Sequence, residues 1–391
     1  VSMGQDRQAD ASIMSFMIEK LQNVILVKLS NQYQFEEKRL VTKIKEYIEV
    51  NLRMTLLMAK GNNLSFFLIT LAPVIIIGFG SDGIFAGTLT LGTLIAFLEY
   101  FHLMFAPARG LVGVYYQTLR AKESMSRIMS FQTIEIPDID KREIRIPEAI
   151  EQIEFKNVQL TLGENMVLKG VNLVFQRGRS YGFVGGSGSG KSTLTFLLCG
   201  LYKPTNGRIK INDQLAENLG IYALSEKIAL VRSSTKLLQG TIRDNLLYGL
   251  KESSVHSLKS VIRLVELEDF IATLPNQLDT QVSDLGTKFS DGQRQRLSIA
   301  RALLMDTEIL ILDEATSAMD SITESALIKN IRKIYQNGML IVISHRLSSV
   351  QHLDEIICLK NGVIVEQDNH VNLISKQGFY WELFDEQLIK V

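Results

Sequence analysis

The stretch from Tyr181 to Leu198, "YGFVGGSGSGKSTLTFLL", has a residue order suited to holding a polyphosphate. A short apolar run leads into a glycine-rich segment ending in Lys191 and Ser192, and an apolar helical pattern follows. Glycines let backbone N–H groups turn inward around an anion, and the helix N-terminus adds partial positive charge. Lys191 would reach the terminal phosphates, and Ser192 would ligate Mg²⁺. The predicted loop residues are Gly185, Gly186, Ser187, Gly188, Ser189, Gly190, Lys191, Ser192 and Thr193.

Two acids follow a second apolar run, in "TEILILDEATSAMD". Four apolar residues before Asp313 predict a buried central strand that delivers Asp313 and Glu314 at its carboxyl end, where ligands gather in such sheets. Asp313 would hold Mg²⁺ through water, and Glu314 would polarise the attacking water as general base. A third run, "GMLIVISHR", ends near His345, which we expect to contact the γ-phosphate. The constellation predicts hydrolysis of a nucleoside triphosphate with Mg²⁺, and Lys191, Glu314 and His345 are the candidate catalytic residues.

The elements that position these residues fall in the second part of the chain. From about Gln152, short β-branched runs alternate with helical patterns, which predicts a mixed α/β domain over 152–391. A charged stretch with Pro137 and Pro147 predicts a linker over 133–151. Residues 1–132 read as helix.

Two apolar runs within the first part predict a membrane hairpin, at about 58–80 and 84–108. Leu64 to Phe79 carries no charge, and the second run holds only Glu99 and His102. With its flanks, each run approaches the roughly 20 residues that a helix needs to cross a bilayer. Lysine and arginine flank the pair outside the connector, which predicts cytoplasmic outer ends. The alternative is a pair of buried core helices in a large soluble protein.

Composition gives no indication of nucleic acid or of an acidic partner. Lysine plus arginine equal aspartate plus glutamate at 42 each, so no net field points to nucleic acid. Cys199 and Cys358 lie in apolar runs far apart in the sequence, which favours buried thiols in a reducing compartment.

Several motifs together resemble one family. The phosphate loop is followed by "FSDGQRQRLSIARALL", then at once by "ILILDEATSAMD", and then by "ISHRL". In this order and spacing the chain resembles a subunit of an ATP-binding cassette (ABC) exporter over almost its whole length. The resemblance implies a multidomain fold: an all-α membrane segment, then an α/β P-loop NTPase cassette with a helical subdomain. Residues 18–111 resemble the second cytoplasmic loop and the last two membrane helices, and 19–29 would carry the coupling helix.

The resemblance also implies partners and a location. Two cassettes would pair head to tail as a homo- or heterodimer, so that Ser290, Gly292 and Gln293 face the nucleotide bound by the other chain. Ala318 to Asp320 would connect the two sites. The chain would be a multi-pass protein of the cell membrane with its nucleotide domain in the cytoplasm, and its exported substrate cannot be named from the sequence.

Three positions depart from the family pattern. Asp291 stands where the family pattern has the first of two consecutive glycines. The repulsion energy between its charge and one phosphate charge would be roughly 3 kcal/mol at 5 Å and an effective dielectric of ~20. Alternatively it points away and pairs with Lys288 or Arg294. We expect it to slow its site without silencing it. Ser233 replaces a glutamine that contacts Mg²⁺, and its shorter side chain makes direct contact doubtful.

Leu162 is the third departure. It stands where family members place an aromatic ring on the adenine, and such stacking is worth roughly 1–3 kcal/mol. We expect weaker ATP affinity or relaxed base selectivity at this cofactor-binding position.

Length is a further departure, because family subunits carry six membrane helices and two are visible here. The sequence therefore predicts the C-terminal part of a longer exporter, or a truncated product. The leading hypothesis is ATP hydrolysis that powers export. The alternatives are a catalytically impaired regulatory subunit of a heterodimer, or a soluble cassette protein of repair or translation, against which the apolar hairpin argues.

Overall fold

The chain divides into two units, residues 1–137 and 138–391, and each is described by itself. The computed structural model describes residues 3–132, 147–234, 237–250, 258–282 and 289–389. Most of the predicted linker over 133–151 lies outside these residues, as does Lys288, one of the two partners considered for Asp291.

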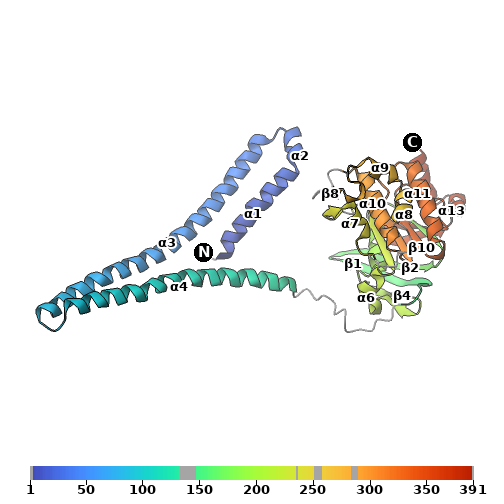
Figure 1. The fold of residues 1–391 in the computed structure, drawn as a ribbon. Helices are drawn as coiled ribbons and strands as arrows, with labels where there is room; N and C mark the ends of the chain where they lie inside the picture. The colour runs from blue at the N-terminus through green and yellow to red at the C-terminus, as the bar shows by residue number, and fades with distance from the viewer. Residues whose placement is uncertain (1–2, 133–146, 235–236, 251–257, 283–288, 390–391) are drawn as a thin grey trace. The chain divides into compact units, whose positions relative to one another are not determined.

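The first unit is helical throughout its described part. Its helices are α1 (Met3–Gln22), α2 (Val24–Leu29), α3 (Tyr33–Phe85) and α4 (Leu91–Gln132). The helices α3 and α4 form a long antiparallel pair joined by a short turn (Figure 1). The turn contains Gly87 at a φ of 73°, which glycine adopts without steric cost. Because α3 continues to Phe85, Ile84 lies in the last turn of α3, whereas the sequence analysis placed it at the start of the second apolar run.

The start of the unit packs on α3 through a mixed polar and aromatic contact. Lys20 on α1 forms an ion pair with Glu36 on α3, with 3.1 Å between Nζ and Oε1. The ammonium of Lys20 and the guanidinium of Arg39 both lie over the Phe16 ring, at 5.3 and 5.8 Å from its centroid. Phe16 is buried by this contact.

Large apolar side chains are exposed along both long helices. On α3 they include Phe66, Phe67, Val74, Ile77 and Phe79, and on α4 they include Ile95, Phe97, Leu103 and Met104. Among the residues that the structure describes, no helix is both long enough and apolar enough to cross a membrane.

The second unit is built on two main sheets. A six-stranded sheet has the order β12-β11-β3-β10-β9-β6, and a four-stranded antiparallel sheet has the order β2-β1-β4-β5. In the larger sheet β6, β9, β10, β3 and β11 run parallel, and β12 is antiparallel to β11. The strands are β1 (Gln152–Leu162), β2 (Asn165–Gln176), β3 (Ser180–Val184), β4 (Asn206–Ile211), β5 (Gln214–Leu215), β6 (Ile228–Arg232), β7 (Gly240–Thr241), β8 (Gln281–Val282), β9 (Ile309–Asp313), β10 (Met339–Ile343), β11 (Glu355–Lys360) and β12 (Val363–Asp368).

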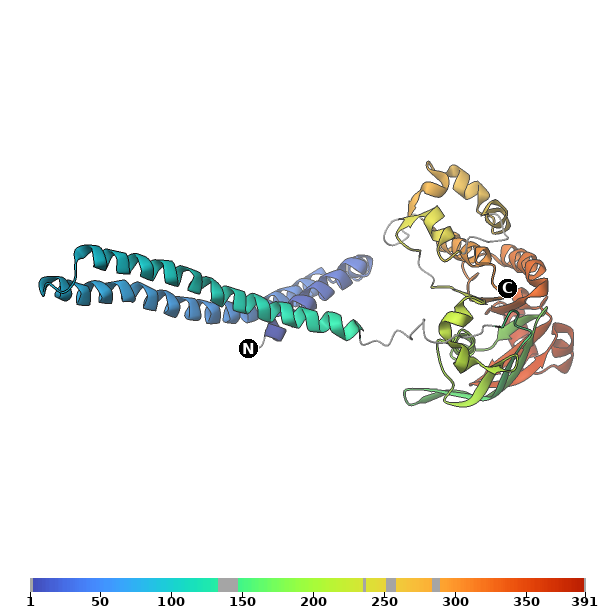
Figure 2. The same ribbon diagram turned by 60° about the horizontal axis from the view of Figure 1, so that its bottom comes forward.

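Helices surround these sheets. They are α5 (Lys191–Leu198), α6 (Ala216–Ser225), α7 (Ile242–Leu247), α8 (Leu258–Leu264), α9 (Glu268–Thr273), α10 (Asp291–Leu304), α11 (Ser321–Ile334), α12 (Leu347–Val350), α13 (His370–Lys376) and α14 (Phe379–Ile389), with 3₁₀ turns η1 (Gln277–Asp279) and η2 (Tyr335–Asn337). In both views of the ribbon, α8 and α9 lie on the side of this unit opposite to β4 (Figure 1, Figure 2). The helical group α7 to α9, packed on α10, fits the predicted helical subdomain.

The strands that carry the motifs are buried on both faces. On β9, Ile309 and Ile311 face the core shared with the antiparallel sheet, whereas Leu310 and Leu312 face the core shared with the helices. Strands covered on both sides read as continuous apolar runs in the sequence, as parallel strands in α/β folds do. The apolar runs therefore predicted the central strands correctly.

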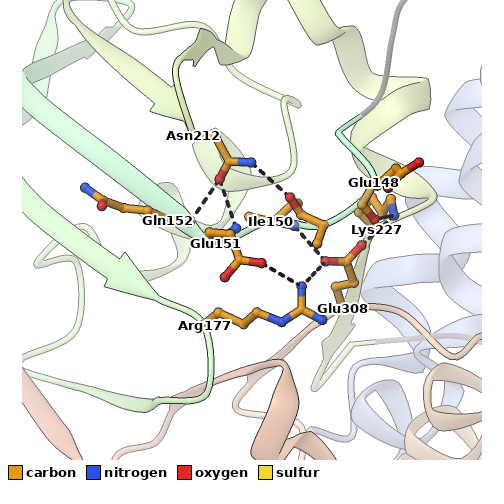
Figure 3. A network of polar contacts seen from close by, with 9 residues as sticks. Glu148, Ile150, Glu151, Gln152, Arg177, Asn212, Lys227 and Glu308 are labelled. Atoms are coloured by element: carbon orange, nitrogen blue, oxygen red, sulfur yellow. Dashed lines mark hydrogen bonds and ion pairs between the residues drawn. The ribbon is translucent and has the colours of Figure 1, made fainter.

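A polar network anchors the chain where it enters the second unit (Figure 3). The Glu308 carboxylate accepts hydrogen bonds from the backbone N–H of Ile150 at 2.7 Å and from Lys227 Nζ at 2.5 Å. It also accepts from Arg177 Nη1 at 3.1 Å. Lys227 donates to the carbonyl of Glu148 at 2.8 Å, and the Asn212 side chain holds the backbone on either side of Ile150. Residues 148–152 are thus fixed by side chains from four separate segments.

Candidate functional site

The predicted phosphate loop connects β3 to α5. A Cβ on Gly185, whose φ is 147°, would lie 2.1 Å from the carbonyl oxygen of Leu359, so no other residue fits there. Gly190 precedes the helix with a φ of 105°, which also favours glycine. At Gly186 and Gly188 an added Cβ would meet no atom within 4 Å. The loop is therefore closed on the side of the sheet and open at Gly186 and Gly188, as a cradle for an anion requires.

Lys191 is the first residue of α5 and points back into this loop. Its Nζ donates to the carbonyl oxygens of Gly185 at 2.9 Å and Gly186 at 2.8 Å, and the side chain is only 5% exposed. Burial lowers the pKa of this ammonium, while the nearby carboxylates of Glu314 and Asp313 act in the opposite direction. Nζ also donates to the Ser189 hydroxyl at 3.4 Å, so its hydrogen-bond partners are all neutral, and the ammonium gains a counter-charge when an anion enters the loop.

Asp313 ends β9 beside Ser192. The Ser192 hydroxyl donates to Asp313 Oδ1 at 3.0 Å, and Asp313 is only 4% exposed. Burial raises the pKa of this carboxyl, although its hydrogen bond with Ser192 and the charge of Arg232 hold it down. The donor set of one hydroxyl and one carboxylate consists of hard oxygens, which suits Mg²⁺ with its remaining positions taken by water and phosphate. These residues fit the implied metal.

Glu314 and His345 meet at the carboxyl edge of the same sheet. Asp313 on β9 is the register partner of Ile343 on β10, and the Glu314 N–H donates to the Ile343 carbonyl at 3.0 Å. The His345 Nε2 lies 2.7 Å from Glu314 Oε1. Glu314 has a φ of 52°, a backbone conformation that bulky residues rarely adopt and that functional sites often retain. The structure thus brings Lys191, Ser192, Asp313, Glu314 and His345 to one edge of the sheet.

The peptide 289–297 starts α10. Ser290 is the N-cap residue: its hydroxyl accepts from the Gln293 N–H, and the Gln293 side chain accepts from the Ser290 N–H. Asp291 is exposed over 77% of its side chain and is paired with Arg294. Of the two arrangements considered for Asp291, the described residues therefore show the outward one, with Arg294 as its partner.

The start of α10 packs on the loop that follows β9. A Cβ on Gly292 would lie 3.3 Å from the carbonyl oxygen of Ala318. Gln295 donates from Nε2 to the Ser317 hydroxyl at 3.0 Å and accepts from the Ala318 N–H at 2.9 Å. Beyond this loop Asp320 caps α11 by accepting from two backbone N–H groups. The backbone after Glu314 is therefore tied to the helix that begins at the signature peptide.

Two predicted site residues make few contacts. The Ser233 side chain is exposed, and its N–H donates to the carbonyl oxygen of Asp313 at 3.1 Å. Leu162 ends β1 at the turn into β2 and is 38% exposed. Ser233 thus lies next to the proposed metal ligand through its backbone, and Leu162 offers an aliphatic surface rather than a ring.

Sequence reasoning missed two arginines. Arg232 ends β6, and its guanidinium lies 3.6 Å from Asp313 Oδ2. Arg346 follows His345 and pairs with Glu324 at 3.0 Å; the Glu324 side chain is only 1% exposed. Arg346 belongs to the quoted "ISHRL" motif, whereas Arg232 was found only through the register of β6 against β9.

Both cysteine thiols have a pKa raised to about 12 by burial. Cys358 is buried as predicted, and Cys199 is partly buried.

Comparison with known proteins agrees with this fold and site. Residues 5–108 match the family model of the ABC transporter transmembrane region, and residues 168–317 match that of the ABC transporter. An ATP-dependent lipid A-core flippase from Syntrophus aciditrophicus is 31% identical over 378 residues, which are 96% of this chain and 63% of that protein. A putative multidrug export ATP-binding/permease protein from Staphylococcus aureus is 35% identical over 390 residues, which are 97% of this chain and 66% of that protein.

A solved structure of a bacterial Atm1-family ABC exporter with ATP bound superposes with a TM-score of 0.87 at 27% identity, over 98% of this chain and 68% of that one. The helical unit and the mixed-sheet unit with its phosphate loop together define a membrane transporter chain with a nucleotide cassette. The chain belongs to the ABC transporter family, a class of ATPases. It spans about two thirds of the length of the curated relatives that it matches.

Proposed function

We propose that this chain binds ATP with Mg²⁺ in the second unit and hydrolyses it to ADP and phosphate to drive export across a membrane. The observation that carries the proposal is the position of Glu314. Its carboxylate lies 2.7 Å from His345 Nε2 and is 34% exposed, at the edge of the sheet where the phosphate loop begins. A carboxylate held open to water beside a phosphate cradle is suited to act as a general base.

The roles of the surrounding residues follow from their contacts. Backbone N–H groups of 185–193 and the start of α5 would surround the phosphates, with Lys191 reaching toward the terminal ones. Ser192 and Asp313 would hold the metal, which when bound neutralises charge that develops on the phosphate oxygens. His345 would orient the Glu314 carboxylate and donate to the γ-phosphate. Leu162 would contact the adenine, and Ser233 would reach the metal through water.

Hydrolysis is expected to require a second cassette. The capping contacts of Ser290 and Gln293 leave the N-terminus of α10 exposed, and Gly292 lets the backbone approach a neighbour closely. Partial positive charge at such a helix start suits the phosphates of a nucleotide bound by a partner chain. We therefore infer a homo- or heterodimer with shared sites.

The state of Asp291 favours a working site over an impaired, purely regulatory one. Its pairing with Arg294 offsets the charge of the carboxylate, and its side chain is 77% exposed. Lys191, Ser192, Asp313, Glu314 and His345 are all present and assembled. We therefore place active hydrolysis ahead of the regulatory role.

The membrane part of the proposal uses the first unit. Exposed apolar side chains on α3 and α4 suit a lipid environment, which supports the predicted hairpin in the cell membrane, with its second arm beginning at Leu91 instead of 84. The second unit would then lie in the cytoplasm. The names of the relatives, a lipid A-core flippase and a putative multidrug export protein, favour an amphipathic cargo.

Substitution of Glu314 by glutamine tests the catalytic assignment. We expect Mg²⁺-dependent phosphate release to fall at least ~100-fold while ATP binding is retained, because the amide keeps the shape but cannot accept the proton. Glu366→Gln, on β12 at the other edge of the sheet, is the matched control and should leave turnover unchanged. Unaltered phosphate release in Glu314→Gln would remove Glu314 as the base.

A further inference from the structure

Arg232 lies beside the proposed metal ligand on the neighbouring strand. The strands β6 and β9 are parallel, and Arg232 is the register partner of Asp313. Register partners in a parallel pair extend to the same face of the sheet, which brings Arg232 Nε to 3.6 Å from Asp313 Oδ2. The position directly precedes Ser233, where the family pattern has its glutamine.

A second contact fixes the guanidinium. Its carbon lies 5.0 Å from the centroid of the Phe196 ring on α5, within the range of a cation–π interaction. Phe196 is in turn held edge-to-face against Tyr202, with 5.4 Å between ring centroids. Arg232 is therefore held between an aromatic face and a carboxylate, although 46% of its side chain is exposed.

The two oxygens of Asp313 have different partners. Oδ1 accepts from the Ser192 hydroxyl at 3.0 Å, and Oδ2 faces Arg232. Asp313 is only 4% exposed, and a buried carboxylate needs a cationic or hydrogen-bonding partner to remain charged. Arg232 thus provides positive charge at the carboxylate that would otherwise be provided by a divalent metal.

We propose that Arg232 is a positioning residue that occupies the electrostatic place of Mg²⁺ beside Asp313 and lets the site accept a nucleoside triphosphate before the metal arrives. This inference rests on the proposed ATP site. It predicts that Arg232 favours nucleotide binding when metal is absent and disfavours metal binding when Mg²⁺ is present. Without metal, Arg232 shields the phosphates from the Asp313 charge and favours binding. With metal, the guanidinium competes with Mg²⁺ for the same carboxylate and disfavours its binding.

The experiment measures binding of the non-hydrolysable ATP analogue adenylyl imidodiphosphate to the purified full chain. Titrations are run in EDTA and at saturating Mg²⁺, and the Mg²⁺ concentration that half-restores binding is also determined. For Arg232→Ala we expect binding in EDTA to weaken about three- to fivefold, the size of a partly exposed ion pair. The Mg²⁺ concentration that half-restores binding of the analogue should fall by a similar factor.

Two further variants separate charge from structure. Arg232→Lys keeps the charge and should behave like the unmodified chain. Arg179→Ala removes an arginine of similar exposure, paired with Glu355 at the amino end of β3, and should change neither titration. The melting temperature of each variant is recorded in parallel.

The outcomes are distinct. Weaker binding of Arg232→Ala in EDTA together with a lower Mg²⁺ requirement supports the proposal. Equal weakening in both conditions, or equal behaviour of the lysine and alanine variants, overturns it and leaves Arg232 as a packing residue. Absence of analogue binding by the unmodified chain in both conditions overturns the proposed ATP site and this inference with it.

Discussion

The Nε2 atom of His345 lies 2.7 Å from Oε1 of Glu314, although the two residues are 31 positions apart in the sequence. They follow the ends of the neighbouring parallel strands β10 and β9. The contact joins the residue proposed as base to a ring that is 50% exposed, so both groups are reachable from solvent. It links the geometry of the base to the strand register of β9 and β10.

Substitution of His345 tests whether its contact with Glu314 contributes to turnover. For His345→Ala we expect the turnover number to fall about 10- to 100-fold, because both the partner of the base and a donor to the γ-phosphate are lost. His345→Gln keeps a donor and should lose less. Steady-state phosphate release checks both variants, and an alanine variant as active as the unmodified chain would contradict the role.

The pairing of Asp291 with Arg294 predicts a mild effect of restoring glycine. For Asp291→Gly we expect turnover to change by less than about fivefold, since exposed ion pairs contribute at most ~1 kcal/mol. Arg294→Ala should reduce turnover more, because it frees the carboxylate near the expected nucleotide of the partner chain. The double variant Asp291→Gly/Arg294→Ala should recover the turnover of Asp291→Gly. A double variant as slow as Arg294→Ala would show that Arg294 acts through its hydrogen bond to the Phe289 carbonyl instead.

Ser233 offers a gain-of-function test. Ser233→Gln extends a side chain from the residue whose N–H already donates to the Asp313 carbonyl at 3.1 Å. We expect about threefold or greater increase in turnover at saturating Mg²⁺, because a longer amide can reach the metal and its water. Ser234→Gln, its exposed neighbour, is the matched control, and equal rates for both variants would contradict the prediction.

Glu308 should be important for stability rather than activity. Its carboxylate is 18% exposed and binds Lys227, Arg177 and the Ile150 N–H (Figure 3). We expect Glu308→Ala to lower the free energy of unfolding of the second unit by about 1–3 kcal/mol, since two partly buried cationic partners and a backbone N–H lose their acceptor. Urea unfolding followed by the fluorescence of Trp381, the single tryptophan, reports on this unit. Glu151→Ala, 66% exposed, should change stability by less than about 0.5 kcal/mol.

Asp368 predicts a pH dependence of stability. Hydrogen bonds from Lys376, Asn372 and the Asn369 N–H lower the pKa of this carboxyl to about 2, below its ordinary value of about 3.9. A depressed carboxyl pKa stabilises the fold above the unfolded-state value, and this stabilisation is lost as pH falls from about 4 toward 2. Asp368→Asn should therefore melt below the unmodified chain at pH 7, with a difference that narrows below about pH 4. A difference that stays constant down to pH 3 would contradict the assignment.

Much of the candidate site was determined by local sequence. The glycines at 185 and 190 require positive φ or close approach, and the apolar runs before Asp313 and His345 read as strands because both faces are covered. These constraints act within a few residues. The family, the phosphate loop and the acid pair were therefore predictable from the chain alone.

Other features were decided only by packing between distant segments. Which partner Asp291 takes depends on the start of α10, and the contact of Arg232 with Asp313 depends on β6 lying next to β9 in register. The network around Glu308 joins segments more than a hundred positions apart. A sequence specifies which residues can pair, but the pairing itself is set by strand order and register, which arise when the whole sheet assembles.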